Sequence, residues 1–457
     1  MASTYLSRTP SNAYYLKATF SFWFKRSGLG EMGLFGRKGS NSTANLSTCH
    51  FSSDDALLIN FRDSGGTSQY YQITNRKFRD TNAWYHFHYI IEGDNSTQGD
   101  RSRLYINGVR ETDFSLNNNP SGSSYQIATF LSSDGAFTVG RALRSQTNTF
   151  GNFDGLISHF HCSTGYAYEP TVFGETDATT GEWKIKTSPT FTPGTDGFTI
   201  LKDGNTITDQ SANSNDFSLT SGTLTKSEDC PSNVFATLNT LTRSGAALTI
   251  QKGNNSKVGS STNSWRSIVS TLGVSTGKYY FEIKVDSIES SDPNNFAVGI
   301  TDYEQTDNQS STNGKFFAFS RGYGYYAGNG YKVNNDPAVA NGSSYGNTFT
   351  TGDIVGCAFD LDNGKIYFSK NGTWQNSGDP TSGSTGTGSA FNITTGYTYF
   401  PVMAQYYSAE QYSFNFGNGY FGTTAVSSAG TNASNNGIFE YDVPTGYTAL
   451  STKGLNE

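Results

Sequence analysis

The sequence predicts an all-β protein built from two antiparallel β-sandwich (jelly-roll) domains that are joined by a packed connector. The first observation is composition: among 457 residues, 14% are aromatic and only 15% are charged, which favours strands over long helices. The second is the 51 glycines, which, with many Ser, Asn and Asp residues, supply turns. The third is that short runs of alternating apolar and polar residues recur along the chain, as half-buried strands require.

The charge pattern and the cysteines exclude several other classes. The formal net charge is −7, and no run of Lys and Arg is long enough to follow a phosphate backbone, so nucleic acid is not an expected partner. Neither a signal-peptide pattern nor 18 consecutive apolar residues occur, so we expect no secretion signal and no membrane insertion. The four cysteines are far apart, which indicates reduced and mostly buried thiols.

The first domain is expected to cover residues 1–165. Its strands are indicated by seven apolar or aromatic runs, at 20–24, 33–37, 56–61, 84–89, 103–109, 137–141 and 153–157. These runs read FSFWF, GLFGR, ALLINF, WYHFHY, RLYINGV, FTVGR and FDGLI. In this order they resemble laminin-G-like and concanavalin-A-like lectin domains. The resemblance implies a jelly-roll sandwich that binds carbohydrate or protein and, in some relatives, hydrolyses glycans.

The connector is expected to cover residues 166–245 and to pack on the sandwiches. It contains too many aromatic residues for a free linker, and the run at 197–201 (GFTIL) predicts a strand that completes the first sandwich.

The second domain is expected to cover residues 246–457 and is organised around a predicted β-hairpin. Residues 354–359 and 365–370 alternate as two strands, and Asp362, Asn363 and Gly364 between them suit a tight turn because Asn and Gly tolerate positive φ. The hairpin sequence resembles the middle of SPRY domains. The flanking stretches at 277–285, 297–300, 399–402 and 414–417 resemble other strands of that family. The resemblance implies a β-sandwich that binds partners through its loops.

A wider resemblance covers nearly the whole chain. The stretch 173–186 (FGETDATTGEWKIK), the run at 209–217 (DQSANSNDF) and the stretches 233–239 and 441–447 are similar to virion proteins of marine bacteriophages and algal viruses. The resemblance implies a virion surface protein made in the host cytoplasm, either a capsid decoration or a tail-fibre tip. Such a protein is expected to form a homo-oligomer, for example a trimer. Its expected partners are other virion proteins and a host surface glycan or receptor.

An enzyme is not expected. Glycan-cleaving relatives of the lectin-like sandwich carry three carboxylates in an E-x-D-x-x-E pattern on one strand. Glu111 with Asp113, and Glu440 with Asp442, both lack the third carboxylate. The alternatives to a virion protein are therefore a free glycan-binding lectin and, third, a glycoside hydrolase.

No cofactor is expected, but two groups of residues have metal-binding chemistry. Asp94, Asn95 and Asp100 in one predicted loop are suitable calcium ligands, although such residues also favour turns by themselves. His86 and His88 flank Phe87, and His159 and His161 flank Phe160, so each pair is predicted on one face of a strand. If the two strands are neighbours, or meet at a trimer axis, the imidazoles suit a transition metal; otherwise they cover a sheet face or an interface.

Aromatic residues among glycines are the predicted ligand contacts, because rigid amphipathic rings stack on sugars and donate hydrogen bonds. The alternative is that some of these rings are core residues of the sandwich. The predicted contacts are Tyr303, Arg321, Tyr323, Tyr326, Trp374, Tyr406 and Tyr407.

Overall fold

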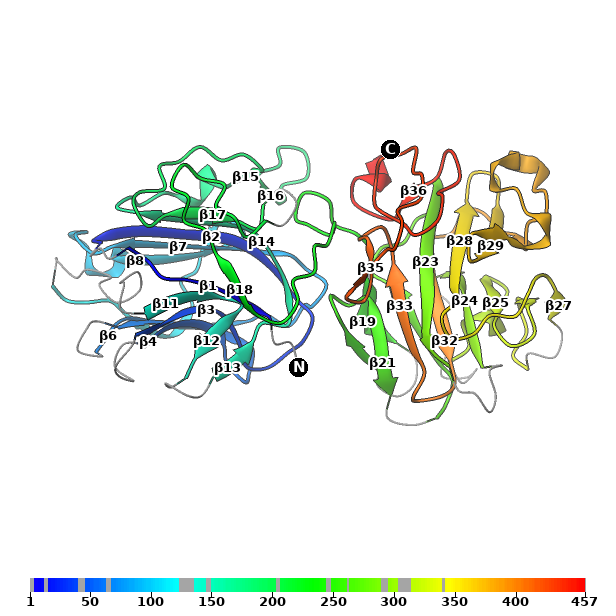
Figure 1. Ribbon diagram of the computed structural model, residues 1–457, viewed down its shortest axis with the longest axis horizontal. Coiled ribbons are helices and arrows are strands. Elements are labelled where there is room, and N and C mark those ends of the chain that lie inside the picture. Colours follow the sequence, from blue (N-terminus) through cyan, green and yellow to red (C-terminus); the bar gives the residue numbers. More distant parts are fainter. Residues whose placement is uncertain are drawn as a thin grey trace. The chain divides into compact units, whose positions relative to one another are not determined.

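The computed structural model describes residues 4–11, 15–39, 46–62, 67–122, 135–144, 149–202, 206–243, 248–260, 263–288, 295–302, 314–338 and 342–456. It divides the chain into two compact units, Met1–Lys226 and Ser227–Glu457 (Figure 1). Both units consist of mainly antiparallel sheets that enclose apolar cores, which confirms the predicted all-β fold class. Within the described ranges, no helix has both the length and the apolar character needed to cross a membrane.

This division differs from the boundaries at 165 and 245 that the sequence suggested. Residues 166–226 belong to the first unit, because β17 (Phe198–Ile200) pairs with its strand β14 (Gly155–Thr164) and β18 (Ser218–Ser221) pairs with its strand β1 (Tyr5–Arg8). Residues 227–245 belong to the second unit, where β19 (Leu238–Arg243) pairs with β22. The predicted connector is therefore shared between the two sandwiches, because its apolar strands complete their sheets.

The first unit contains a sheet built around β3, which we call the β3 sheet. Its order is β10-β6-β5-β4-β3-β11-β1-β18, with β12 and β13 beside β3. The strands are β1 (Tyr5–Arg8), β3 (Met32–Gly39), β4 (Leu46–Phe51), β5 (Ala56–Arg62), β6 (Ser68–Lys77), β10 (Phe114–Asn118), β11 (Gly135–Val139), β12 (Arg141–Leu143) and β13 (Thr149–Asn152), together with β18.

The opposing sheet of this unit, the β2 sheet, has the order β17-β14-β2-β7-β8-β9. Besides β17, its strands are β2 (Lys17–Arg26), β7 (Tyr85–Glu92), β8 (Ser102–Ile106), β9 (Val109–Arg110) and β14 (Gly155–Thr164). A 3-10 turn, η2 (Gln98–Asp100), precedes β8. β17 lies within the stretch 197–201 where the sequence predicts a strand.

Alternation along β2 separates the core from the outer face. Phe22 stacks on Phe87 of β7 at 4.7 Å and on Phe160 of β14 at 4.6 Å, where the distances join ring centroids. All three rings are fully buried in the core between the two sheets. Because strand side chains alternate, Ser21 and Trp23 point to the opposite, outer face of the β2 sheet.

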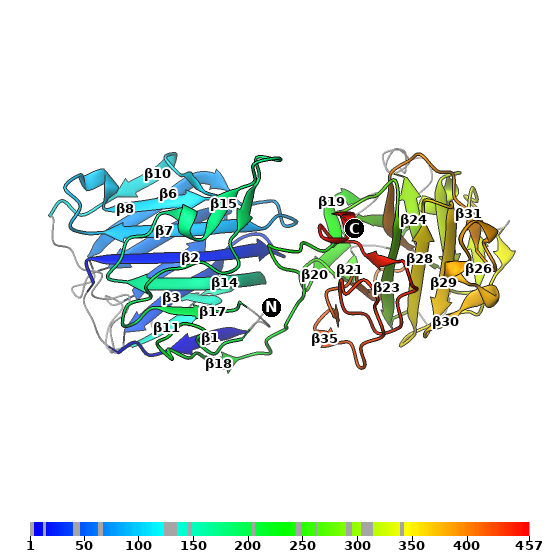
Figure 2. The ribbon, with the colours of Figure 1, turned by 90° about the horizontal axis from the view of Figure 1, so that it is seen from above.

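A separate two-stranded hairpin covers this outer face. It follows η3 (Pro170–Val172) and consists of β15 (Gly174–Thr176) and β16 (Trp183–Ile185), which pair with each other. Figures 1 and 2 show the hairpin lying over β2 and β7. The outer face of β2 and β7 is therefore not open to solvent.

The second unit also contains two main sheets. The first has the order β19-β22-β32-β24-β25-β26-β27, and the second has the order β20-β21-β33-β23-β28-β29-β30 with β31 and β36 attached. The first sheet contains β19, β22 (Arg266–Ser270), β24 (Phe296–Asp302), β25 (Gly322–Tyr326), β26 (Tyr331–Val333), β27 (Ser343–Ser344) and β32 (Tyr399–Gln405). The second contains β20 (Leu248–Gln251), β21 (Ser256–Ser260), β23 (Lys278–Ser287), β28 (Ile354–Asp360), β29 (Lys365–Lys370), β30 (Thr373–Trp374), β31 (Phe391–Asn392), β33 (Gln411–Asn415) and β36 (Thr448–Ala449).

The predicted hairpin is present. β28 pairs antiparallel with β29, and Gly364 in the turn has a φ of 62°, which explains the need for glycine. The small hairpin β34 (Tyr420–Phe421) and β35 (Thr424–Ala425) and short 3-10 turns complete the unit: η6 (Phe316–Ala318), η7 (Gln375–Ser377), η8 (Pro380–Thr385) and η9 (Gly454–Asn456). As expected from the sequence, the described cysteines are free thiols; Cys49, Cys162 and Cys357 are buried.

Candidate functional site

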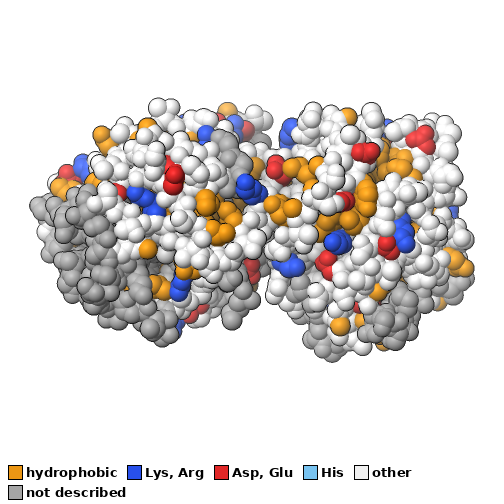
Figure 3. Space-filling model, in the orientation of Figure 1, with side chains coloured by type: hydrophobic (Ala, Val, Ile, Leu, Met, Phe, Trp, Pro, Cys, Tyr) orange, Lys and Arg blue, Asp and Glu red, His pale blue; other side chains and the backbone are white. Residues whose placement is uncertain are grey.

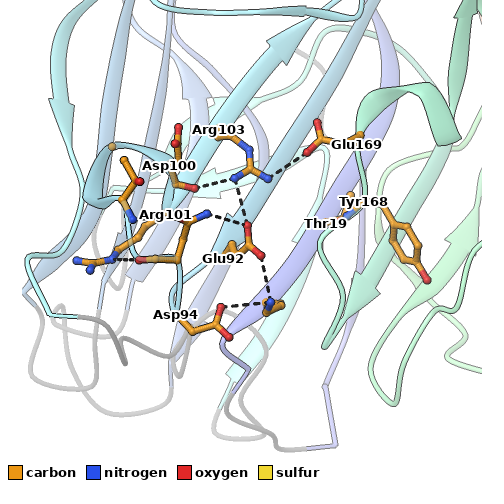
Figure 4. Close-up of polar contacts among 12 residues, drawn as sticks. Thr19, Glu92, Asp94, Asp100, Arg101, Arg103, Tyr168 and Glu169 are labelled. Carbon is orange, nitrogen blue, oxygen red and sulfur yellow. Dashed lines mark hydrogen bonds and ion pairs between the residues drawn. The ribbon is translucent and has the colours of Figure 1, made fainter.

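The loop between β7 and β8 holds the aspartates that the sequence suggested as calcium ligands (Figure 4). Asp94 pairs with Lys17 of β2 at 3.4 Å, and Asp100 pairs with Arg110 of β9 at 2.5 Å. The side-chain oxygen of Asn95 accepts a hydrogen bond from the backbone N–H of Thr97. Each of the three suggested ligands therefore already has a partner from the protein itself.

Glu92 is the centre of this polar network. Its carboxylate accepts hydrogen bonds from Lys17 at 3.0 Å, Asn95 at 3.1 Å and Arg103 at 3.2 Å. Burial alone would raise the pKa of Glu92, but these donors outweigh burial and lower it. Arg103 also pairs with Glu169 at 3.2 Å, so the network connects the β2 sheet to the segment that covers it (Figure 4).

The histidines lie on the outer face of the β2 sheet, but their strands are not neighbours, because β2 lies between β7 and β14. His86 is fully buried and uses both ring nitrogens. Its Nε2 lies 2.8 Å from Oγ of Ser21, and its Nδ1 accepts a hydrogen bond of 3.0 Å from the indole N–H of Trp183. This hydrogen bond from the indole requires a neutral His86 ring that carries its proton on Nε2.

His88 and His161 have equally specific surroundings. Nε2 of His88 lies 2.8 Å from the carbonyl oxygen of Tyr168, and Nδ1 of His161 lies 3.0 Å from the hydroxyl of Thr199. The ring of Phe173 lies between them, with centroids 5.5 Å from His88 and 5.3 Å from His161. These imidazoles thus belong to an aromatic layer between the sheet and its cover.

His159 departs from the regular alternation that the sequence suggested. A register shift between Ser158 and His161 and a positive φ of 52° at His159 mark a bulge in β14. Nδ1 of His159 lies 2.7 Å from the hydroxyl of Ser158. In the described part of the chain, no group of three or more His, Cys, Asp and Glu side chains is arranged to hold a metal ion.

Burial controls the protonation of this layer. It lowers the pKa of His88 and of His161 to about 3, and it lowers the pKa of His86 well below its usual value. The three rings are therefore neutral at physiological pH, and the hydrogen bond that His86 accepts from Trp183 requires a neutral ring.

Two of the predicted ligand contacts are core residues. Tyr323 and Tyr326 lie on β25, and both are 3% exposed. Tyr326 donates a hydrogen bond to the side-chain oxygen of Asn295 at 3.1 Å, and its ring packs with Phe317. They resemble loop residues in sequence because glycines surround them, but the glycines of β25 allow close packing of neighbouring strands.

The other predicted contacts are spread over the second unit. Trp374 is half-buried and packs on Tyr280, and the half-buried Tyr406 and Tyr407 pack on each other with ring centroids 5.1 Å apart. Tyr406 also contacts Trp265 at 6.1 Å. Tyr303 lies outside the described residues.

Arg321 contacts residues 389–398, here called the Tyr397 loop. The guanidinium carbon of Arg321 lies 4.1 Å from the ring centroid of Tyr397, and Nε of Arg321 is paired with Asp302. Tyr397 remains 37% exposed. Arg321 thus presents a stacked cation and an accessible ring at the same place.

The buried Tyr323 contacts this loop through a hydrogen bond and through its ring. Its hydroxyl accepts a hydrogen bond of 3.0 Å from the backbone N–H of Thr394, and its ring lies 5.5 Å from that of Phe391. Tyr399 donates a hydrogen bond of 2.6 Å to the carbonyl oxygen of Thr394. The loop is therefore held in a defined conformation, and Tyr323 positions it without facing solvent.

Further cations border the same loop. Nζ of Lys332 lies 5.3 Å from the ring centroid of Phe391 and donates a hydrogen bond to the carbonyl oxygen of Ala390. Lys365 donates to the side chain of Asn392 at 2.6 Å. Because aromatic rings and cations lie together, the loop has the chemistry to bind a sugar that carries a negative charge.

Sequence reasoning missed Tyr397, Phe391 and Lys332. The available signal was the stretch 394–398 (TTGYT), in which one aromatic residue stands among small polar residues and a glycine. Such a residue has few apolar neighbours along the chain to bury it.

The paired carboxylates considered for glycan hydrolysis have separate local partners. Glu111 pairs with Arg76 at 2.6 Å, and Asp113 accepts a hydrogen bond from Asn75. In the other unit, Glu440 and Asp442 accept hydrogen bonds from Ser427 and Thr431. On the face drawn in Figure 3, described Lys and Arg side chains lie scattered among Asp and Glu rather than in a basic stripe.

Comparisons with known proteins assign both units. Residues 3–172 match the model of the concanavalin A-like lectin/glucanases superfamily, and residues 278–419 match that of the SPRY domain. The chain contains a concanavalin A-like domain and a SPRY domain. Both are folds of the binding type. The two domain resemblances noted in the sequence, to concanavalin A-like lectins and to SPRY domains, are confirmed.

The similar curated proteins share only a short region with the chain. A Ran-binding proteins 9/10 homolog of Drosophila melanogaster is 33% identical over 98 residues, and the dual specificity protein kinase splA of Dictyostelium discoideum is 31% identical over 103 residues. Each match covers 21% of the chain but only 9% and 4% of the respective relative.

Two solved structures match parts of the chain with low TM-scores and low sequence identity. The SPRY domain of human HERC1 is 15% identical with a TM-score of 0.30, and the match covers 39% of the chain and 96% of that domain. The heptameric SAP-like pentraxin from Limulus polyphemus is 16% identical with a TM-score of 0.27, and the match covers 36% of the chain and 71% of the pentraxin.

Proposed function

We propose that the chain is a non-enzymatic glycan-binding protein, and that the Tyr397 loop of the SPRY domain is its ligand contact. The observation that carries the proposal is the stack of Arg321 on the exposed ring of Tyr397. A ring of this kind offers its face to a sugar, and the guanidinium stacked on it, whose Nε pairs with Asp302, places a cation beside a carboxylate or sulfate group of the sugar.

The surroundings of the loop support this proposal. Lys332 adds a second cation, and the hydrogen bond from Thr394 to Tyr323 fixes the loop before a ligand arrives. A preformed site loses less conformational entropy on binding than a flexible one. The preferred ligand class is therefore an acidic oligosaccharide.

The test is a glycan array probed with the purified full chain and with the Tyr397→Ala variant. The expected result is binding to uronate-containing, sialylated or sulfated glycans that the variant loses. Tyr331→Ala is a matched control, because Tyr331 is a half-buried tyrosine of the neighbouring strand β26 and, among the described residues, has no hydrogen bond or ring contact with the Tyr397 loop. Equal binding by all three proteins would contradict the proposed site.

We further propose that the protein is displayed on the surface of a bacteriophage particle, as a capsid decoration or a tail-fibre tip, in homo-oligomeric form. The support is the resemblance to virion proteins noted in the sequence at residues 173–186, 209–217, 233–239 and 441–447. Electron microscopy of particles labelled with an antibody against the chain tests this role, and native mass spectrometry tests the oligomer. Particles without label would leave a free lectin as the function.

A further inference from the structure

The segment that covers the β2 sheet is attached in an unusual way. We call residues 166–186 the strap; it follows β14, and residues 187–197 lead from it to β17. β15 and β16 of the strap pair only with each other among the described strands, so no backbone ladder joins them to the sheet below. The strap is instead held through side chains. For example, the hydroxyl of Thr19 donates to the carbonyl oxygen of Tyr166 and accepts from the backbone N–H of Tyr168.

Imidazoles make up a large part of this attachment. His86 accepts the indole hydrogen bond of Trp183, His88 lies 2.8 Å from the carbonyl oxygen of Tyr168, and His161 packs on Phe173 with ring centroids 5.3 Å apart. The ring of Trp183 fits between two glycines, since a Cβ atom at Gly108 or Gly174 would lie about 2.5 Å from it. The closed strap therefore packs tightly on these rings, and its Trp183 contact requires a neutral His86.

The charged groups around these imidazoles do not favour protonation. Arg103 of β8 lies near His88. His159 of β14 and Lys202, which follows β17, lie near His161. A positive charge on any of these neighbours opposes protonation of the nearby imidazole. Tyr105 packs its ring on His88, and Glu169 of the strap is engaged by Arg103 and Tyr105. The charged residues of the hairpin pair with one another: Lys184 with Glu175 and Asp177, and Lys186 with Glu175. In the described ranges, no carboxylate forms an ion pair with His86, His88 or His161.

We propose that the strap is an acid-released cover: protonation of the buried imidazoles detaches residues 166–186 and uncovers the outer face of β2 and β7. The uncovered face carries Ser21, Trp23, His86 and His88. The inference is independent of the function proposed for the Tyr397 loop.

The chemistry of each contact explains why protonation opens the strap. A proton on Nδ1 of His86 points at the indole N–H of Trp183, so two donors oppose each other where one hydrogen bond existed. A proton on Nδ1 of His88 creates a positive charge at a buried atom that has no hydrogen-bond acceptor. Opening the strap returns both rings to water, where an imidazole titrates near pH 6.5.

Linkage gives the size of the effect. Each imidazole that is neutral in the closed form and titrates at about 6.5 in the open form multiplies the opening constant by about 30 at pH 5. Two or three such rings together raise the opening constant on the order of 10³-fold or more. Repulsion between the charged rings keeps this increase below the product of the separate factors.

Hydrogen exchange of the full chain, followed by mass spectrometry at pH 7.4, 6.0 and 5.0, tests the proposal. Rates are corrected for the intrinsic pH dependence of amide exchange, so that peptides of the strap report its opening constant. The expected result is a rise on the order of 10³-fold at pH 5.0 in the strap, while peptides of β2 and β14 keep their protection. Unchanged strap protection at pH 5.0, or equal loss of protection throughout the β2 sheet, would overturn the proposal.

Variants separate titration from packing. In the double variant His88→Gln, His161→Gln, only His86 of the three rings titrates, and the expected rise between pH 7.4 and 5.0 falls to about 30-fold. The readout is a ratio within one protein, so a strap that is already looser at pH 7.4 does not obscure it. His50→Gln is the control, because His50 is equally buried but lies on β4 of the opposing sheet. A double variant with the full rise, or a control that loses it, would contradict the mechanism.

Discussion

The aromatic layer under the strap and the Tyr397 loop combine the same kinds of side chain with opposite results. Under the strap, the rings of His86 and Trp23 stack with centroids 4.9 Å apart, and His86 is fully buried with both nitrogens engaged. In the Tyr397 loop, the ring of Tyr397 is partly exposed under a guanidinium. The difference shows that ring chemistry alone does not define a binding site; an accessible face and a supported backbone are also required.

Acid stability is where the two regions should differ most. His86, His88 and His161 have pKa values far below 6.5 in the folded protein, so their contribution to stability is complete above pH 6.5. It is lost progressively as the pH falls from 6.5 towards 3. We expect these three rings to lower the free energy of unfolding of the first unit by about 4–6 kcal/mol between pH 7 and pH 5, at roughly 2 kcal/mol for each ring. His50 adds to this loss, because burial also lowers its pKa to about 3.

Urea unfolding of the full chain at both pH values measures this difference. Hydrogen exchange of peptides from each unit reports the unfolding of that unit separately. A first unit that is as stable at pH 5 as at pH 7 would show that these rings titrate normally.

Removal of the Trp183 side chain should have the next largest effect. Trp183→Ala deletes the ring between Gly108 and Gly174 and also the hydrogen bond to His86, with an expected loss of about 2–4 kcal/mol in the protection of the strap. Trp183→Phe keeps most of the ring and should lose about 1–2 kcal/mol. Exchange at pH 7.4 measures both, and equal losses would mean that the hydrogen bond contributes nothing.

A change in the Tyr397 loop should affect binding but not stability. Tyr397→Ala removes a partly exposed ring, and we expect a loss of affinity for the selected glycan of about 5- to 100-fold, or 1–3 kcal/mol, as for other stacked rings. The thermal midpoint should stay within about 1–2 °C, since surface substitutions rarely exceed 0.5 kcal/mol. A lower midpoint without any change in affinity would assign the ring to packing.

The smallest effect is expected at the suggested calcium ligands. Asp94 is 40% exposed and pairs with Lys17 in the structure, so Asp94→Asn should change stability by no more than about 1 kcal/mol. Thermal unfolding with calcium and with a chelator should give the same midpoint in both proteins. A calcium-dependent rise in the original chain that Asp94→Asn removes would instead establish the metal site.

Local patterns predicted the strands well, because a period of two residues and turn residues such as Gly364 act over a few positions. They also placed Phe87 and Phe160 in the core, with His86 and His88 on the other face. The cover over that face could not be predicted, since Trp183 meets His86 from 97 positions further along the chain. The bulge at His159 likewise depends on pairing with β2 and has no signature in the residue order.

The predicted ligand contacts show the same limit. Tyr323 and Tyr326 stand among glycines, a context that is common to exposed loops and to closely packed strands. The small polar residues and the glycine beside Tyr397 indicate exposure, but the stack of Arg321 on its ring joins residues that are distant in sequence. Exposure depends on which segments meet in space, and a single sequence does not contain this information directly.

The most direct test of the proposed function compares two oligosaccharides that differ only in one carboxylate. Affinities of the full chain and of Arg321→Ala for the acidic and the neutral compound are measured by calorimetry at low and at physiological salt. We predict that the original chain prefers the acidic compound at least about 10-fold, and that Arg321→Ala loses this preference but keeps residual binding through Tyr397. Equal affinity of the original chain for both compounds, or an unchanged preference in the variant, would contradict the account.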